Sequence, residues 1–311
     1  MSDQPSPNPD SGDDWHELPL DAWRDTYTTL HKWIQIVGKV RQALTPPIDH
    51  WWHVTFYLTS DGLTTSPIPY PRGLRTFEID LNFIEHCLDI RTSSGEARTI
   101  PLRPQSVAAF YHEFVSALHA LGVEVEITRE PDEPPDAIPF DADHTNAAYD
   151  AAYAHRWWQI MRLSDIVLKE FRSRFRGKAS PVHFFWHSFD LTATRFSGRR
   201  EQRQPDTERA ERHFDADEEF GVGFWPGSGA VQAPAYYAYV SPQPSGFPDA
   251  TVKPAEAFYC QPFGEFILLY EDVRRSADPK QMLLDFFQST YEAAARLGHW
   301  DRETLEQPSE E

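Results

Sequence analysis

A short motif occurs twice in this chain, and this duplication constrains the fold more than any other feature. His-Lys-Trp-Ile-Gln-Ile at residues 31–36 returns as His-Arg-Trp-Trp-Gln-Ile at residues 155–160. A second pair of related segments, 50–59 and 183–192, follows the two motifs, with four identities in ten positions. Segments that recur in the same order predict two copies of one structural unit.

Both predicted units begin and end with a helix. Apolar residues at three- and four-residue steps predict opening helices at 21–44 and 147–175 and closing helices at 104–121 and 279–297. Alternating or aromatic runs between them predict strands at 50–59, 63–69, 76–83, 86–93, 123–128, 182–195, 235–241, 256–260 and 265–270. We therefore expect an α+β fold with an internally duplicated α-β-β-β-β-α unit, mostly antiparallel sheets, and helices packed on one face.

Composition shifts along the chain suggest its domain boundaries. The predicted segments are a disordered tail at 1–14, a first unit at 15–128, an acidic Pro-rich linker at 129–146, a second unit at 147–300 with a charged insertion at 199–220, and a C-terminal tail at 301–311. We expect the two units to form one compact domain.

The formal net charge of −19 argues against nucleic acid as a partner, because phosphate binding needs a basic surface. The charge is uneven: residues 156–203 carry eleven Lys and Arg against four Asp and Glu, which leaves −26 for the rest. We expect no membrane span, because no apolar run approaches the roughly 20 residues that a bilayer requires, and no secretory signal, because the first residues lack a basic and an apolar region. With Cys87 and Cys260 as the only cysteines, a cytoplasmic location is the simplest expectation.

Histidines in the repeated segments are the first candidates for chemistry. If 50–59 is a strand, His50 and His183 hold equivalent places at the start of two core-facing rows, and His53 points the other way. On the first helix, His31 and Gln35 are four residues apart and share a face. These imidazoles suit proton transfer near neutral pH, although a surface pair explains His31 and Gln35 equally well.

The segment from residue 183 to 199 combines aromatic and charged residues, as small-ligand pockets do. Its two arginines could hold an anionic group through planar, forked donors. The predicted ligand-contacting set is Arg195, Ser197, Arg199, Lys39 and Gln35, with Trp52, Phe185 and Trp186 as apolar walls. Asp190 is a catalytic candidate whose alternative role is to neutralise an arginine.

A metal site formed by His50, His53 and His183 is an alternative interpretation. On an extended strand His50 and His53 point apart, and His183 and His187 lie about 13 Å from each other, so neither pair chelates one ion. A site that unites His50 with His183 across the two units stays open. The motifs specify no cofactor, and a Gly-x-Ser-x-Gly elbow for a serine nucleophile does not occur.

Several motifs resemble those of a bacterial family known as a domain of unknown function. They include His-Trp-Trp-His at 50–53, Pro-Val-His-Phe-Phe-Trp at 181–186, Ser-Phe-Asp-Leu at 188–191 and Thr-Arg-Phe-Ser-Gly-Arg at 194–199. The resemblance extends from Trp15 to Arg302. The family usually has glycine at the position of His187, which favours His183 over His187 as a site residue. The resemblance implies no activity.

Three functional hypotheses follow. The first is a small-molecule binder or enzyme whose His/Arg/aromatic pocket lies between the two units. The second is a histidine-ligated metalloprotein, and the third is a non-catalytic interaction or structural protein. The sequence leaves the oligomeric state open.

Overall fold

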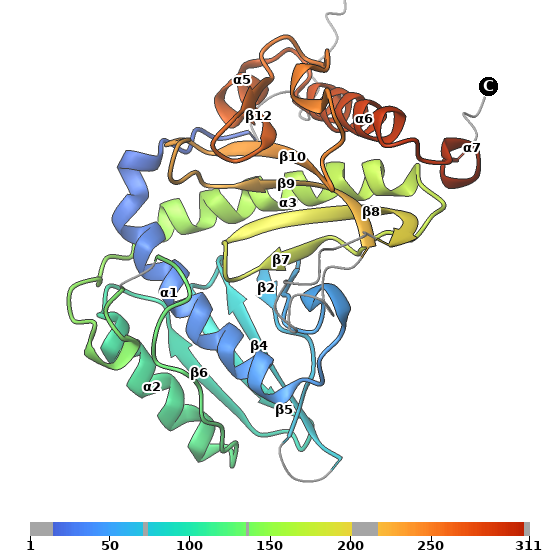
Figure 1. The fold of residues 1–311 in the computed structure, drawn as a ribbon. Coiled ribbons are helices and arrows are strands. Elements are labelled where there is room, and N and C mark those ends of the chain that lie inside the picture. The colour runs from blue at the N-terminus through green and yellow to red at the C-terminus, as the bar shows by residue number, and fades with distance from the viewer. Residues whose placement is uncertain (1–14, 71–73, 135–136, 201–216, 308–311) are drawn as a thin grey trace, which may run out of the picture.

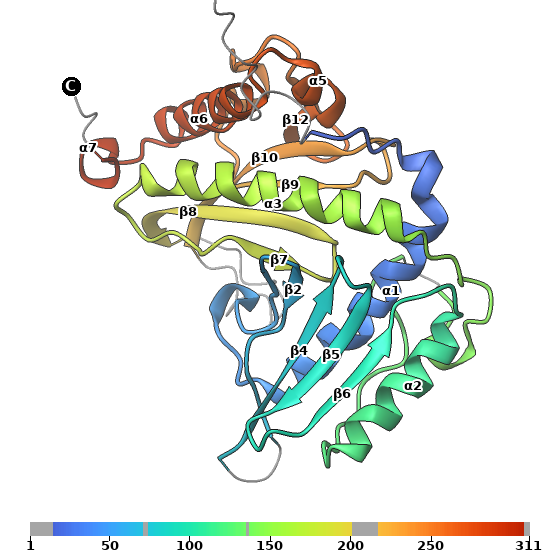
Figure 2. The same cartoon turned by 180° about the vertical axis from the view of Figure 1, so that it is seen from behind.

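The computed structural model describes residues 15–70, 74–134, 137–200 and 217–307. Two antiparallel sheets of six strands each carry helices along their sides (Figures 1 and 2). This arrangement confirms the predicted α+β class. The expected tail at 1–14 lies outside the described residues. None of the helices within these ranges is long and apolar enough to span a bilayer.

The first half begins with helix α1 (Leu20–Leu44) and ends with helix α2 (Val107–Ala120). Its strands are β1 (Tyr57–Leu58), β2 (Gly62–Thr64), β3 (Ile68–Pro69), β4 (Thr76–Asn82), β5 (Cys87–Thr92) and β6 (Ala97–Pro101). They pair in the order β1-β2-β4-β5-β6, and β3 also pairs with β4. Ser106 caps α2 by accepting a hydrogen bond from the Ala109 N–H, which fixes where this helix starts.

The second half begins with helix α3 (Ala151–Ser173), capped by Asp150. Its strands are β7 (His183–Phe185), β8 (Asp190–Arg200), β9 (Asp217–Trp225), β10 (Ala235–Ser241), β11 (Phe258–Cys260) and β12 (Glu265–Leu269). They pair in the order β11-β12-β10-β9-β8-β7. Helices α5 (Tyr270–Arg275), α6 (Pro279–Leu297) and α7 (Arg302–Leu305) complete the chain, so part of the expected C-terminal tail is helical.

The two sheets meet at their edges. Phe56 and Phe184 exchange a pair of backbone hydrogen bonds of 2.9 and 3.0 Å, which link the start of β1 to β7. Helices α1 and α3 are also in contact: the rings of Trp23 and Trp157 are stacked, with their centroids 6.5 Å apart. One hydrophobic cluster includes buried residues from both halves. The core therefore continues across the junction.

The predicted strand at 50–59 is wrong over most of its length. Residues Asp49–Trp51 form the short 3₁₀ segment η1, and only Tyr57 and Leu58 belong to a strand. His50 and Trp51 have φ of 59° and 58°, in the left-handed region that an extended chain does not use. The alternating faces predicted for these residues therefore do not exist, and His50 and His183 are not in equivalent local structures.

Other strand predictions need correction. A turn at 186–189 interrupts the strand predicted at 182–195, and Phe189 has φ of 60°. Residues 123–128 form no strand, whereas β6 and β9 were not predicted. Each half thus has six strands between its helices instead of four. The shared order of elements is consistent with duplication, which stays a prediction, as do the unit boundaries.

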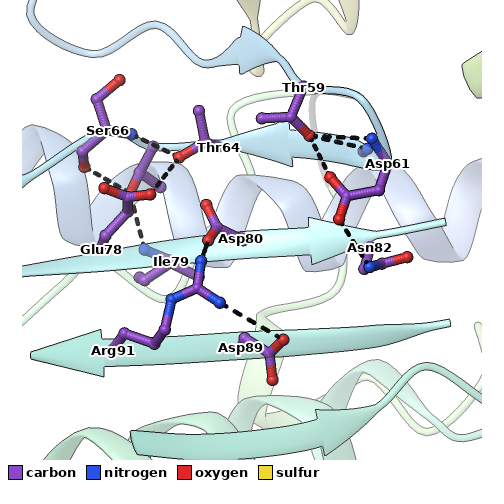
Figure 3. Close-up of polar contacts among 12 residues, drawn as sticks. Thr59, Asp61, Thr64, Ser66, Glu78, Ile79, Asp80, Asn82, Asp89 and Arg91 are labelled. Atoms are coloured by element: carbon purple, nitrogen blue, oxygen red, sulfur yellow. Dashed lines mark hydrogen bonds and ion pairs between the residues drawn. The ribbon is translucent and has the colours of Figure 1, made fainter. Parts of the chain in front are cut away.

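The first sheet has a polar open face, on the side away from its core (Figure 3). In β4 the buried residues Phe77, Ile79 and Leu81 alternate with Glu78, Asp80 and Asn82. On the polar side, the Arg91 guanidinium bonds to Asp80 and lies 4.0 Å from Asp89. The side chain of Arg91 is 56% exposed and that of Asp80 is 17% exposed, so this face is partly open to solvent.

Candidate functional site

A cavity of about 460 Å³ lies over the open face of the second sheet. Its floor consists of residues from four strands: Asp190, Thr192, Thr194 and Phe196 on β8, Glu219 on β9, Tyr237 and Tyr239 on β10, and Glu265 on β12. Segment η1 and the residue after it cover the cavity with His50, Trp51 and Trp52, and Phe185, Trp225 and Phe263 add further rings. A volume of this size is typical of small-molecule sites.

The alternation of β8 decides which of its side chains reach this cavity. Asp190, Thr192 and Thr194 line it, whereas Arg195 packs against helix α3 on the other face. Successive residues of a strand point to opposite faces, so a pocket on one face excludes every second residue. The cavity floor therefore has carboxylate and hydroxyl groups and lacks the Arg195 guanidinium.

Two glycines of β9 make room for the tyrosines of the floor. Gly223 and Gly221 lie opposite Tyr237 and Tyr239 in the register of β9 and β10. A Cβ atom at Gly223 would come within 2.3 Å of the Tyr237 hydroxyl, and one at Gly221 within 2.3 Å of the Tyr239 ring. Both phenol rings thus lie across the bare backbone of β9 and reach toward β8.

Segment η1 holds His50 at the edge of the cavity. Its imidazole lies 3.5 Å from Asp217 and 3.7 Å from Glu219, while the Lys178 ammonium is 3.2 Å from its Nε2 atom. Two consecutive residues with left-handed backbone, His50 and Trp51, cost on the order of 1 kcal/mol each. That conformation turns His50, Trp51 and Trp52 toward the second sheet.

Asp190 is the most buried carboxylate of the cavity. It accepts hydrogen bonds from the Ser188 hydroxyl and from the Tyr237 hydroxyl. Burial raises the pKa of Asp190, and these two donors act in the opposite direction. Because both donors are fixed by the turn and by β10, the carboxylate is held in place at the floor.

Glu265 differs because no other described residue pairs with its carboxylate. It is half-buried, and no hydrogen bond or ion pair joins its side chain to the rest of the described chain. Burial raises its pKa to about 7, and the nearby charge of Asp190 contributes. Glu133 from the linker lines the same cavity and is exposed at its mouth. Glu219 contributes a further carboxylate that accepts from the Tyr239 hydroxyl at 2.9 Å.

The cavity includes only some of the residues predicted from the sequence. His50, Trp52, Phe185 and Asp190 line it together. Trp186 does not: its ring packs on Gly38 of α1, and its indole N–H donates to the Val54 carbonyl at 2.9 Å.

Three predicted residues on α1 bind other parts of the chain. His31 Nε2 donates to the carbonyls of Trp186 and His187 at 3.1 and 2.9 Å, and burial lowers its pKa to about 4. Gln35 bonds to the backbone of the linker at 132–133. Lys39 pairs with Asp132 at 2.6 Å. These contacts support the turn before β8 and hold the linker against α1.

The other two predicted histidines also have protein partners. His183 Nδ1 lies 2.9 Å from the Thr55 hydroxyl, and burial lowers its pKa to about 4. His53 Nδ1 accepts from the Ile48 N–H at 3.1 Å. His50, His53 and His183 therefore engage separate groups. Within the described ranges, three or more His, Cys, Asp or Glu side chains do not converge on a possible metal position.

The predicted anion clamp of Arg195, Ser197 and Arg199 is not part of the cavity. Arg195 is buried with its guanidinium 3.5 Å from the Phe171 ring centroid and 4.4 Å from that of Tyr291, and burial lowers its pKa to about 9. Ser197 and Arg199 both bond to Glu218. The two guanidinium groups thus contact protein groups on the helix side and at the end of β8.

Most residues of the cavity were not predicted from the sequence. They include Glu265, Trp225, Tyr237, Tyr239, Phe263 and Glu219. A usable signal existed in β9 and β10, where glycine alternates at 221 and 223 and tyrosine alternates at 237 and 239. Glycines opposite large rings are typical of strands across which side chains lie flat.

Comparisons with known proteins agree with the resemblance seen in the motifs. No curated protein and no solved structure matches the chain. A family model, described as a family of unknown function (DUF5996), matches residues 15–307. This range includes every strand and helix described above, and the chain therefore belongs to the DUF5996 family.

Proposed function

We propose that this protein binds a small organic cation in the cavity over the second sheet. The observation that carries the proposal is Glu265, a half-buried carboxylate among aromatic rings with no partner among the described residues. An ionised carboxylate in such surroundings is costly unless a positive charge accompanies it. A ligand cation would supply that charge.

The charges around the cavity favour the same class of ligand. Its described lining includes Glu133, Asp190, Glu219 and Glu265 but no lysine and no arginine. Lys178, the ammonium beside His50, already pairs with Asp217 at 2.7 Å. The net charge of −19 adds a long-range attraction for cations. An anionic ligand, as first expected from the arginines, would meet repulsion here.

The aromatic lining, together with the carboxylates, favours an organic cation as the ligand. Trp51, Trp52 and Trp225 border the cavity, and the faces of such rings attract cations. The rings also shield the carboxylates from water, which strengthens their attraction for a bound charge. A hydrated metal ion would gain less from these rings than an organic cation with apolar groups.

Three probes of similar size and different charge test the proposal: benzylamine, benzyl alcohol and benzoate. In isothermal titration calorimetry at pH 8, benzylamine should bind at least about tenfold more tightly than benzyl alcohol. One ion pair in a site shielded from water contributes free energy of this order. Benzoate should bind more weakly than the alcohol because it faces several carboxylates.

Two carboxamide variants locate the site. Glu265→Gln should reduce benzylamine affinity to that of benzyl alcohol, whereas Glu78→Gln on the open face of the first sheet should leave it unchanged. Tighter binding of benzoate than of benzylamine would overturn the proposal. So would equal benzylamine affinity in wild type and Glu265→Gln.

A further inference from the structure

One end of the cavity has three aromatic walls arranged around a corner. The ring centroids of Trp225 and Phe263 are 6.0 Å apart with their planes at 81°, and those of Trp225 and Tyr237 are 6.1 Å apart at 67°. All three rings line the same cavity. On β12, Ile267 lies opposite Tyr237, and Glu265, two residues before Ile267, lines the same cavity.

Neighbouring groups hold these rings in place. Tyr237 is buried over Gly223, and its hydroxyl donates to Asp190. Trp225 ends β9, where it pairs with Ala235, and its indole nitrogen lies 3.5 Å from the Ser228 hydroxyl. Phe263 packs so closely on the backbone at Gly229 that a Cβ there would be 3.2 Å from its ring. The corner is thus formed before a ligand arrives.

We propose that the cation bound at this corner is a methylated ammonium group, with Trp225, Tyr237 and Phe263 around the methyl groups and Glu265 as the counter-charge. This inference rests on the proposed function and specifies the ligand class for the same site. Methylation spreads the positive charge over apolar surface and removes N–H donors. Rings that meet near right angles contact such a group on several sides.

Asp190 adjoins the ring corner through the Tyr237 hydroxyl. It is already bonded by Ser188 and Tyr237, so its acceptor positions are partly occupied. A primary ammonium needs several free acceptors to replace its water shell. Apart from the Glu265 carboxylate, the ring corner offers ring faces instead of free acceptors, and it therefore favours a methylated cation over a primary one.

Three probes that share a hydroxyethyl group separate these effects: choline, ethanolamine and 3,3-dimethylbutan-1-ol. Choline and the alcohol have the same shape and differ in charge, whereas choline and ethanolamine share the charge and differ in methylation. In calorimetry at pH 8 we expect choline to bind about tenfold tighter than either of the others, as several cation–π contacts predict.

A matched pair of phenylalanines on the β11–β12 hairpin provides the variants. Phe263 is 39% exposed and lines the cavity, and Phe258 is 42% exposed and lies outside its lining. Phe263→Leu should lower choline affinity about fivefold and leave ethanolamine affinity unchanged. Phe258→Leu should change neither. Because both rings are partly exposed, both variants should fold.

The outcomes distinguish this inference from the proposed function. If ethanolamine binds as tightly as choline and both lose affinity in Glu265→Gln, the methylated ligand class is wrong and cation binding stands. If 3,3-dimethylbutan-1-ol binds as tightly as choline, charge does not matter and both proposals fail. If Phe258→Leu and Phe263→Leu reduce choline affinity equally, the ring corner is not the site.

Discussion

The open faces of the two sheets use similar residues for different purposes. Both sheets are antiparallel, and both open faces carry several carboxylates. On the first sheet Glu78, Asp80 and Asp89 lie beside Arg91 and hydroxyl groups (Figure 3), at a surface that is only partly exposed. On the second sheet Asp190 and Glu265 lie among aromatic rings.

This difference indicates that the aromatic residues covering the second sheet, more than its carboxylates, create the binding cavity. Segment η1 and the residue after it bring Trp51 and Trp52 over the second sheet, and Phe263 closes another side. Burial then raises the pKa of Asp190 and of Glu265. Carboxylates in such a site attract a bound cation more strongly than carboxylates at a solvated surface.

The largest loss of stability should come from adding a side chain where the tyrosine rings of the second sheet lie across β9. A Cβ at Gly223 would lie 2.4 Å from the Leu191 carbonyl oxygen as well as against Tyr237, so a side-chain rotation cannot relieve the clash. We expect Gly223→Ala to lower the free energy of unfolding by about 3 kcal/mol, measured by urea denaturation. Gly221→Ala meets only the Tyr239 ring at its nearest contacts and should cost less. An equal loss in both variants would contradict this account.

Removing one carboxylate from each face compares the faces directly. Asp190→Ala leaves the Ser188 and Tyr237 hydroxyls without their acceptor, and we expect a loss of about 2 kcal/mol in unfolding free energy. Asp80→Ala breaks an ion pair with the exposed Arg91 and should cost about 0.5 kcal/mol. Chemical denaturation at pH 7 measures both. Equal costs would show that the two faces are not different environments.

Glu265 should make stability depend on pH through a carboxylate that has no partner among the described residues. On the first face burial also raises the pKa of Glu78, but that carboxylate accepts from the Thr64 hydroxyl. The pKa of Glu265 rises from an ordinary 4.5 to about 7 in the folded protein, so the unfolded chain ionises first as pH increases. Wild type therefore loses stability relative to Glu265→Gln between these two values. At pH 8 the variant should be more stable by about 1 kcal/mol, after allowance for partial exposure, and at pH 4 the two should be equal. A variant less stable than wild type at pH 8 would argue against an unpaired carboxylate.

The smallest change in stability should come from a substitution on the open face of the first sheet. Arg91→Gln removes the guanidinium beside Asp80 and Asp89, whose pairing is exposed to water. Its loss should change unfolding free energy by about 0.5 kcal/mol or less and leave benzylamine affinity unchanged. Calorimetry and urea denaturation on one preparation test both parts, and weaker benzylamine binding in this variant would place the site on the wrong sheet.

Local patterns predicted the helices and many of the strands well. The opening helix predicted at 21–44 is α1, and the closing helix predicted at 279–297 is α6, because their apolar periodicity and their ends are encoded locally. Strands β4 and β10 were likewise predicted close to their bounds. The conformation of residues 50–55 was not predicted. Its two successive left-handed residues, His50 and Trp51, are not glycines, so the sequence contains no sign of the turn.

The site was harder to predict because distant segments build it. His50, Trp52, Phe185 and Asp190 were named from aromatic and charged motifs near the two repeats. Glu265 lies on β12, which reaches the cavity only through the pairing order β12-β10-β9-β8. The arginines were misplaced for a similar reason: the break at 186–189 sets the phase of β8, and that phase turns Arg195 to the helix side.

A crystal structure of the protein soaked with 4-bromobenzylamine would test cation binding over the second sheet most directly. The anomalous signal of bromine locates the probe wherever it binds on the molecule. We predict a bromine peak inside the cavity, with the amine nitrogen within hydrogen-bond distance of the Glu265 carboxylate. A peak beside Glu78 and Asp80 on the first sheet, with the cavity empty, would contradict the account.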